Sequence, residues 1–234
     1  MPARKTSGKK KISARPALRG PLAPARVAAI LKALDEAYPN ADCALVHRSP
    51  WELLVATILS AQCTDVRVNL VTPELFRRFP SPQAFAAATL EEIEEAIRST
   101  GFYHNKAKSI QGAAKKLIAD FGGCVPQTLA ELTTLPGAAR KTANVVLGVA
   151  FGKAEGVVVD THVLRITRRL ELAKSETPEK VEQELMRILP RSRWIGFSHQ
   201  IIHHGRQICQ ARKPKCNQCG LEPLCRAKDK SWNS

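Results

Sequence analysis

Four cysteines near the C-terminal end constrain the folding of this 234-residue chain more than any other feature. Their spacing is Cys209-x6-Cys216-x2-Cys219-x5-Cys225. Thiolates this close in sequence can converge on one metal centre, and thiolate donors suit zinc or an iron–sulfur cluster. A four-cysteine zinc site normally contains two Cys-x2-Cys pairs, whereas this segment contains one. The wide arms therefore favour a 4Fe–4S cluster over zinc, and four unrelated buried cysteines remain a third, weaker interpretation.

The remaining cysteines, Cys43, Cys63 and Cys124, are isolated. An odd total of seven with one tight cluster does not match a secreted disulfide framework. No apolar run approaches the ~18 residues that a membrane span requires, and no apolar signal-peptide core follows the N-terminus. We therefore expect an intracellular, reducing location, which in a bacterium means the cytoplasm or nucleoid. Organelle targeting by the basic N-terminal segment stays open.

The charge of the chain is strongly positive, with a formal value of +15. Residues 1–20 contain seven basic side chains and no acidic one, and without them the chain still carries +8. Such an excess predicts a polyanionic partner first and an anionic membrane surface second. Residues 1–23 contain few apolar anchors, so we expect them to form a flexible basic arm.

Apolar residues recur at three- and four-residue spacing from about residue 24 onward, which predicts helices. Only Val157–Val159 resembles a strand, and it is too short to build a sheet. The fold class is therefore expected to be all-α. The longer predicted helices cover 50–62, 65–78, 82–86, 90–98, 105–120, 127–133, 141–151, 161–170, 177–189 and 194–208.

A tight turn joins two predicted helices within residues 135–147. Backbone N–H groups at such a turn and at the following helix start can hold a phosphate without reading base sequence. Lys141 lies in the first turn of the second helix, where the helix dipole disfavours an ammonium and favours a neutral, nucleophilic amine. From its position alone, an ordinary surface lysine is the favoured interpretation.

Asp160 changes that balance. The helix over 141–151 rises about 15 Å, and extended residues 156–160 can span about 13–16 Å on the way back. Asp160 can therefore return to the level of Lys141, and it is also placed to cap the helix that starts at Thr161. A lysine and a carboxylate that converge beside a phosphate-binding turn predict an active site.

Residues 135–148 resemble the helix-hairpin-helix of the endonuclease III family of DNA glycosylases. The four-cysteine spacing matches the same family, and the resemblance covers about residues 24–228. Further matching segments, in the family's order, are Leu59–Asn69, Gly101–Ala107, Val159–Val163 and His204–Arg206.

The resemblance implies two α-helical domains with a DNA cleft between them. One is a six-helix barrel over residues 43–153 that ends in the hairpin. The other combines residues 24–42 with 154–228 and holds a 4Fe–4S cluster on Cys209, Cys216, Cys219 and Cys225. The implied partner is double-stranded DNA with damaged bases or abasic sites, bound by a monomer.

The implied chemistry is that of a bifunctional DNA glycosylase and abasic-site lyase acting on oxidised pyrimidines. Lys141 would attack C1′ of the damaged nucleotide, displace the base and form a Schiff base, after which β-elimination cuts the strand. Asp160 would activate the lysine or stabilise positive charge on the sugar.

Because the substrate base must leave the duplex, side chains must fill the gap. The resemblance assigns this role to Gln62 and makes Phe102 a wedge between bases. The simpler alternatives are a helix-end hydrogen bond for Gln62 and a core position for Phe102. The other residues expected to contact DNA are Leu135, Gly137, Ala139, Arg140, His162 and the cations Arg212, Lys213 and Lys215 of the loop between the first two cysteines.

Two positions depart from the family pattern. Ala139 replaces the second hairpin glycine, and if that position requires a positive φ, alanine costs about 1–2 kcal/mol. We would then expect a shifted hairpin or a weaker hold on phosphate. Cys63 stands where a small residue is common, and a packing role is the simplest interpretation.

Two other functions compete with this hypothesis. The first is a monofunctional glycosylase for mismatched or alkylated bases, but relatives of the adenine-mismatch type lack the lysine found here at Lys141. The second is a non-catalytic DNA-binding or redox-sensing protein that carries an iron–sulfur cluster.

Overall fold

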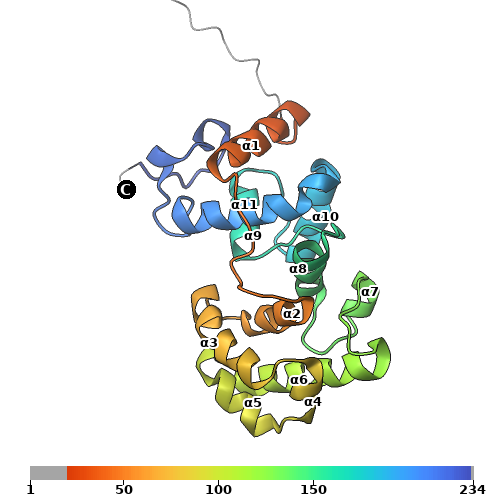
Figure 1. Cartoon of the computed structure of the whole chain (residues 1–234). Coiled ribbons are helices and arrows are strands. Elements are labelled where there is room, and N and C mark those ends of the chain that lie inside the picture. The colour runs from red at the N-terminus through yellow and green to blue at the C-terminus, as the bar shows by residue number, and fades with distance from the viewer. Residues whose placement is uncertain (1–19, 233–234) are drawn as a thin grey trace, which may run out of the picture.

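The computed structural model describes residues 20–232, so residues 1–19 of the predicted basic arm lie outside the described part of the chain. Within residues 20–232 all regular structure is helical, which confirms the predicted all-α class (Figure 1). Val157–Val159 forms no strand. The helices are α1 (Pro24–Ala37), α2 (Pro50–Leu59), α3 (Asp65–Arg78), α4 (Pro82–Ala87), α5 (Leu90–Ile97), α6 (Tyr103–Phe121), α7 (Leu129–Leu132), α8 (Arg140–Phe151), α9 (Thr161–Arg169), α10 (Pro178–Ile188) and α11 (Trp194–Gln207), with short 3-10 turns η1 (Arg98–Thr100), η2 (Arg191–Arg193), η3 (Cys216–Gln218) and η4 (Glu222–Leu224).

Side-chain caps explain why many of these helices begin where they do. An N-cap side chain accepts a hydrogen bond from a backbone N–H of the first turn, which would otherwise lack a partner. Thr89 adds a capping box, because its own backbone N–H donates a hydrogen bond to the Glu92 carboxylate. The capping residues are Ser49, Thr64, Ser81, Thr89, Thr128 and Asp160.

The helices pack around two separate hydrophobic cores. The first core uses buried residues between positions 45 and 147, on helices α2 to α8 and the segments that join them. The second core combines residues 27–34 of α1 with residues 157–221 of α9, α10, α11 and the C-terminal segment. Helix α1 therefore lies beside the last part of the chain, at the opposite end of the molecule from α4 and α5 (Figure 1).

Arg26 fastens α1 to this second core. Its buried guanidinium donates hydrogen bonds to the carbonyl oxygens of Pro21, Leu170 and Leu224 at 2.5, 2.7 and 2.6 Å. Burial lowers the pKa of Arg26. Three carbonyl dipoles from three segments thus replace the water that the charge loses on folding, which satisfies a buried cation without a carboxylate.

No helix between residues 20 and 232 combines the length and the apolar character that crossing a membrane requires.

Candidate active site and cysteine cavity

Lys141 and Asp160 line the same cavity, as the chain geometry predicted. The helices of the first core form one half of the molecule, and those of the second core form the other half. The cavity lies where the two halves meet, because its walls include Thr57 and Val145 from the first half and Ile202 from the second. Lys141 is exposed in the first turn of α8. A lysine amine and a carboxylate therefore share one opening between the two halves.

Asp160 is the N-cap of α9. Its Oδ1 accepts a hydrogen bond from the backbone N–H of Val163 at 2.8 Å, which confirms the predicted cap. Because this bond fixes the carboxylate, the orientation of Asp160 towards the cavity is set by the helix rather than by a flexible side chain.

The hairpin turn requires its glycine for two reasons. Gly137 has a φ of 78°, and a Cβ there would lie 2.8 Å from Cβ of Ser109. Ala139, in contrast, has φ −65° and ψ 168°, which any residue adopts. The strain that alanine would bring at a positive φ therefore does not arise. Ala139 also leaves α8 without a side-chain cap, so the first-turn N–H groups remain available to an external acceptor.

Arg140 joins the two halves of the molecule. It donates from Nε and Nη2 to Glu182 of α10 at 2.8 and 3.1 Å, and Glu182 also accepts from Nδ2 of Asn144 at 2.9 Å. The Glu182 side chain is 6% exposed and that of Arg140 is 46% exposed. Gly156 packs directly against this network, since a Cβ there would lie 1.9 Å from Oε1 of Glu182.

Leu135 occupies a structural position in the hairpin. Its side chain is 3% exposed in the first core, and its N–H donates to the carbonyl oxygen of Leu132. Both groups are therefore engaged within the protein, and the DNA contact that the resemblance implied for this position stays a prediction.

Gln62 and Phe102 stand on two adjacent loops in left-handed backbone conformations, with φ values of 53° and 49°. Both side chains are exposed, and Phe102 is 63% exposed, which excludes the alternative of a core aromatic residue. Within the described residues, Gln62 forms no helix-end hydrogen bond through its side chain. Both positions are thus compatible with contact to another molecule.

His162 is half-buried between α9 and α11. A Cβ at Gly205 would lie 2.5 Å from its Nδ1, so the glycine lets the two helices approach each other. Nη2 of Arg165 lies 3.2 Å from the same nitrogen. Burial lowers the pKa of His162, which favours the neutral ring at neutral pH.

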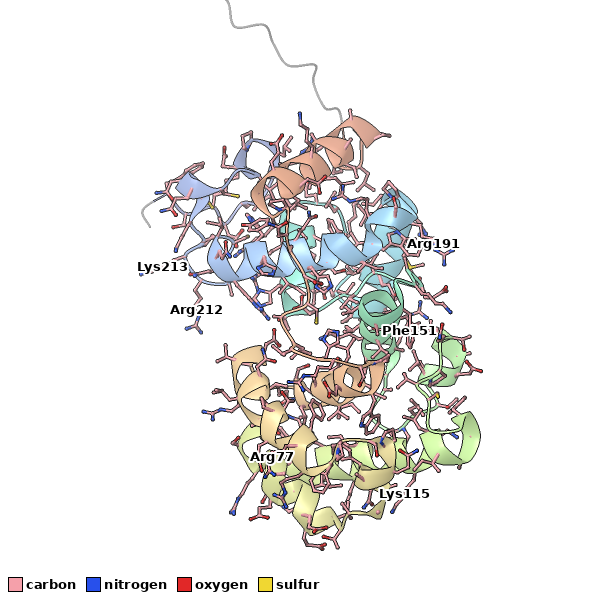
Figure 2. The ribbon with its side chains drawn as sticks, in the orientation of Figure 1. Arg77, Lys115, Phe151, Arg191, Arg212 and Lys213 are labelled. Carbon is pink, nitrogen blue, oxygen red and sulfur yellow. The ribbon has the colours of Figure 1, made fainter. Side chains whose placement is uncertain are left out.

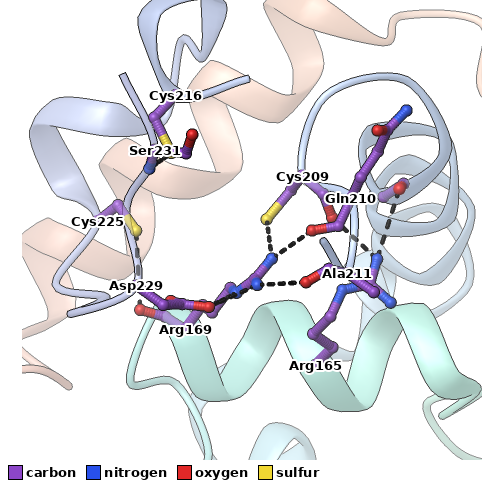
Figure 3. Close-up of polar contacts among 10 residues, drawn as sticks. Arg165, Arg169, Cys209, Gln210, Ala211, Cys216, Cys225, Asp229 and Ser231 are labelled. Carbon is purple, nitrogen blue, oxygen red and sulfur yellow. Dashed lines mark hydrogen bonds and ion pairs between the residues drawn. The ribbon is translucent and has the colours of Figure 1, made fainter. Parts of the chain in front are cut away.

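The four clustered cysteines, Cys209, Cys216, Cys219 and Cys225, line a second cavity. Polar groups face their sulfur atoms (Figure 3). Nη1 of Arg169 and the N–H of Ser231 donate to Sγ of Cys209 and Cys216, each at 3.4 Å. Nε2 of His204 lies 3.6 Å from Sγ of Cys219.

The cavity fits a thiolate-bound metal centre. Burial raises the pKa of Cys219 to about 11 and also raises the pKa of Cys225. Cationic metal centres stabilise such thiolates, and an all-sulfur donor set suits zinc or an iron–sulfur cluster. Among the described residues, no group of three or more His, Cys, Asp or Glu side chains has the geometry of a single-ion site. The four thiols instead border one shared space.

Two arginines of α9 hold the loop that follows Cys209 (Figure 3). Arg169 donates to the carbonyl oxygens of Gln210 and Ala211 at 2.7 and 3.1 Å, and Arg165 donates to that of Cys209 at 2.9 Å. The loop is therefore anchored through its backbone, which leaves its side chains free to point outward.

The three loop cations have different surroundings. Arg212 and Lys213 are exposed and project from the surface of the second half (Figure 2). Lys213 has a left-handed φ of 50°. Lys215 is partly buried and borders the cysteine cavity. Of the three, Arg212 and Lys213 are therefore the more accessible to a phosphate beyond the protein surface.

Lys106, Glu182 and Gly156 are structurally important residues that the sequence reasoning missed. Of the three, Lys106 has the clearest signal in the sequence, because it interrupts the apolar stripe of α6 beside Ala107 and Ile110. Glu182 and Gly156 acquire their roles only through contacts between distant segments.

The fold and the site define a DNA glycosylase of the helix-hairpin-helix class. The family described as HhH-GPD superfamily base excision DNA repair protein matches residues 55–191. Endonuclease III of Synechocystis sp. is 56% identical over 200 residues, which cover 86% of this chain and 91% of that protein. Endonuclease III of Escherichia coli K12 is 40% identical over 201 residues, with coverages of 86% and 95%.

Solved structures agree with these relatives. A non-covalent Endonuclease III–DNA complex superposes with a TM-score of 0.83 at 44% identity, covering 87% of this chain and 95% of that one. A trapped Endonuclease III–DNA covalent intermediate gives 0.83 at 45% identity, with the same coverages. The chain belongs to the endonuclease III family, and it is a DNA glycosylase with abasic-site lyase activity in base excision repair.

Proposed function

We propose that Lys141 is the nucleophile and Asp160 its partner in excising oxidised pyrimidines from double-stranded DNA. The observation that carries this proposal is the shared cavity of the two residues, beside the uncapped start of α8. A phosphate held by the first-turn N–H groups would place the sugar of a flipped nucleotide near Lys141.

In the proposed reaction, the neutral amine of Lys141 attacks C1′ and the damaged base departs with the glycosidic electron pair. The amine then forms a Schiff base with the opened sugar, and loss of a C2′ proton expels the 3′ phosphate by β-elimination. Asp160, oriented by Val163, accepts a proton from the lysine or stabilises positive charge on the sugar.

We also propose that the two cores correspond to two domains. Residues 43–153 would form a six-helix barrel, and residues 24–42 with 154–228 the cluster domain. The separate membership of the two cores supports this division. The DNA would lie across the opening between them, where Gln62, Phe102, the hairpin, Arg212 and Lys213 would contact it.

The cluster domain would hold a 4Fe–4S cluster on the four cysteines of the second cavity. When bound, such a cluster would stabilise and crosslink the four thiolates and so stiffen the loop that carries Arg212 and Lys213. None of the seven cysteines is paired in a disulfide, which is compatible with a reducing compartment for the protein.

Borohydride trapping tests the nucleophile. Duplexes that contain thymine glycol or an abasic site should form a covalent adduct with the wild type and none with Lys141→Gln. Lys180→Gln, a change at another exposed lysine, should trap normally. Base release without any adduct would favour a monofunctional glycosylase, and duplex binding without base release would favour a non-catalytic DNA-binding protein.

Asp160→Asn separates the cap from the chemistry. Asparagine caps helices about as well as aspartate, so the stability should stay close to that of the wild type, while excision should fall about a hundredfold or more. Unchanged excision in a folded Asp160→Asn variant would remove Asp160 from the mechanism.

Metal analysis tests the cluster. Purified protein should contain iron and sulfide and absorb broadly near roughly 400 nm, as 4Fe–4S proteins do as a class. Stoichiometric zinc without iron or sulfide would contradict the proposal.

A further inference from the structure

Lys106 connects the two loops that carry Gln62 and Phe102. It lies on α6, is only 5% exposed, and donates from Nζ to the carbonyl oxygens of Leu59 and Thr100, both at 2.8 Å. Leu59 is the last residue of α2 and Thr100 is the last residue of η1. One ammonium thus binds the ends of the two elements from which the exposed loops start.

A buried ammonium at this position needs an explanation. Burial lowers the pKa of Lys106, and removing a cation from water is unfavourable unless strong partners replace it. Its two partners are backbone carbonyls rather than a carboxylate. Carbonyls at a helix C-terminus lack helical partners and carry partial negative charge, so they accept strong charge-assisted hydrogen bonds. An apolar side chain would fill the same space without the burial penalty, but it could not link the two ends.

The two loops also contain backbone conformations that are unfavourable by themselves. Gln62 and Phe102 are both non-glycine residues in the left-handed region, which side chains other than glycine rarely adopt. Such conformations persist only when their surroundings hold them. Gln62 follows Leu59 by three residues, and Phe102 follows Thr100 by two. The Lys106 ammonium therefore holds the backbone at points two or three residues before each left-handed residue.

We propose that Lys106 is a positioning residue that sets Gln62 and Phe102 at a fixed separation, so that both enter the duplex together. The proposal rests on the role of these two residues as duplex probes given above. Lys106 acts before the chemistry, on extrusion of the damaged base, and not on the attack by Lys141. Its loss should therefore affect substrates that still carry a stacked base.

The test compares Lys106→Met with Lys108→Met, an exposed lysine of the same helix. Single-turnover excision of paired thymine glycol should slow about ten- to a hundredfold in Lys106→Met. Borohydride trapping on a preformed abasic site, which has no base to extrude, should change less than about threefold. Lys108→Met should match the wild type in both assays. Equal losses of Lys106→Met on the two substrates would overturn the proposal, and so would no loss on either.

A double-mutant comparison adds a readout that general destabilisation would not produce. Gln62→Ala should slow excision strongly in the wild type and much less in the Lys106→Met background, because coupled residues are non-additive. Full additivity would overturn the proposal. Lys106→Gln retains a hydrogen-bond donor and should recover part of the excision rate that Lys106→Met loses. If neither Lys106 variant folds, the role of Lys106 is purely structural and the proposal is overturned.

The variants distinguish the role of Gln62 and Phe102 as duplex probes from the positioning role of Lys106. If Gln62→Ala and Phe102→Ala leave excision unchanged in the wild type, the proposed duplex probes are wrong. If they slow excision while Lys106→Met does not, only the positioning role of Lys106 is wrong.

Discussion

Arg140 and Glu182 form a two-point ion pair across the junction of the two cores, with N–O distances of 2.8 and 3.1 Å. Arg140 immediately precedes Lys141 in the chain, and Glu182 lies on α10, which packs in the second core with the helix that Asp160 caps. The pair therefore fixes the start of α8 relative to the element that holds Asp160. Asn144, one turn further along α8, binds the same carboxylate.

Replacing Glu182 by glutamine should loosen this junction. We expect the free energy of unfolding to fall by about 1–3 kcal/mol, because Arg140 can regain water while the buried side chain loses its charge-assisted bonds. Excision should slow as Lys141 loses its fixed position. Denaturant titration and single-turnover assays measure both effects. As a control, Glu155→Gln removes the charge from the exposed ion pair with Arg191 and should change the free energy of unfolding by less than about 1 kcal/mol. Equal effects of the two variants would contradict the role of Glu182 in fixing the start of α8.

Gly156 and Gly196 offer a matched pair of glycine substitutions. A Cβ at Gly156 would lie 1.9 Å from Oε1 of Glu182 and 2.5 Å from Nδ2 of Asn144, whereas a Cβ at Gly196 would meet nothing within 4 Å. Gly156→Ala should therefore destabilise the protein by about 1–3 kcal/mol through overpacking. Gly196→Ala lies inside α11 and should stabilise it by about 0.5–1 kcal/mol. Thermal unfolding of both variants checks the two signs, and a neutral Gly156→Ala would mean that the network has room to move.

Ala139→Asp should change stability and DNA affinity in opposite directions. An aspartate at this N-cap can accept the free N–H groups of α8 and stabilise the helix by about 0.5–2 kcal/mol. The same carboxylate would occupy and repel the phosphate site, so binding to every duplex should weaken. Ala139→Ser supplies a cap without the charge and should weaken binding less. Thermal unfolding and salt-dependent binding assays test this, and unchanged affinity of Ala139→Asp would mean that no phosphate binds at the start of α8.

His199, which borders the Lys141 cavity, should contribute to acid sensitivity. Burial is the main cause that lowers its pKa; Asp42 opposes the shift and His203 adds to it. Below the ordinary histidine value near about 6.5, the unfolded chain therefore binds a proton that the folded protein resists, so stability decreases as the pH falls. In His199→Gln, the free energy of unfolding should depend less on pH below about 6.5. Above about pH 7.5 its curve of unfolding free energy against pH should be parallel to that of the wild type. Identical slopes below pH 6.5 would contradict the prediction.

The features that the sequence predicted well depend on local patterns or on chain length. Helix α3 lies over the predicted residues because Thr64 caps it and its apolar spacing is regular. The meeting of Lys141 and Asp160 followed from the rise of one helix and the reach of one extended segment. Helix α2, however, ends at Leu59 and not at residue 62, because the chain turns through the left-handed conformation at Gln62.

The features that could not be predicted depend on contacts between distant segments. Lys106 lies 47 residues from the carbonyl of Leu59, and Arg140 lies 42 residues from Glu182. No local pattern shows that a basic side chain will turn inward to bind a carbonyl or a carboxylate. The backbone conformation of Ala139 could not be predicted either. An alanine in place of the family's glycine does not show whether the turn has a positive or a negative φ at that position, and the structure gives −65°.

The position of α1 has a consequence for the order of events during synthesis. The first core is complete once residue 147 has left the ribosome, but the partners of Arg26 include Leu224, which lies 198 residues further along the chain than Arg26. At about 5–20 residues per second, α1 must wait about 10–40 seconds with its apolar face uncovered while the rest of its core is translated. The first half of the molecule can therefore fold before the second, which can close only when α1 meets the segment that contains Leu224.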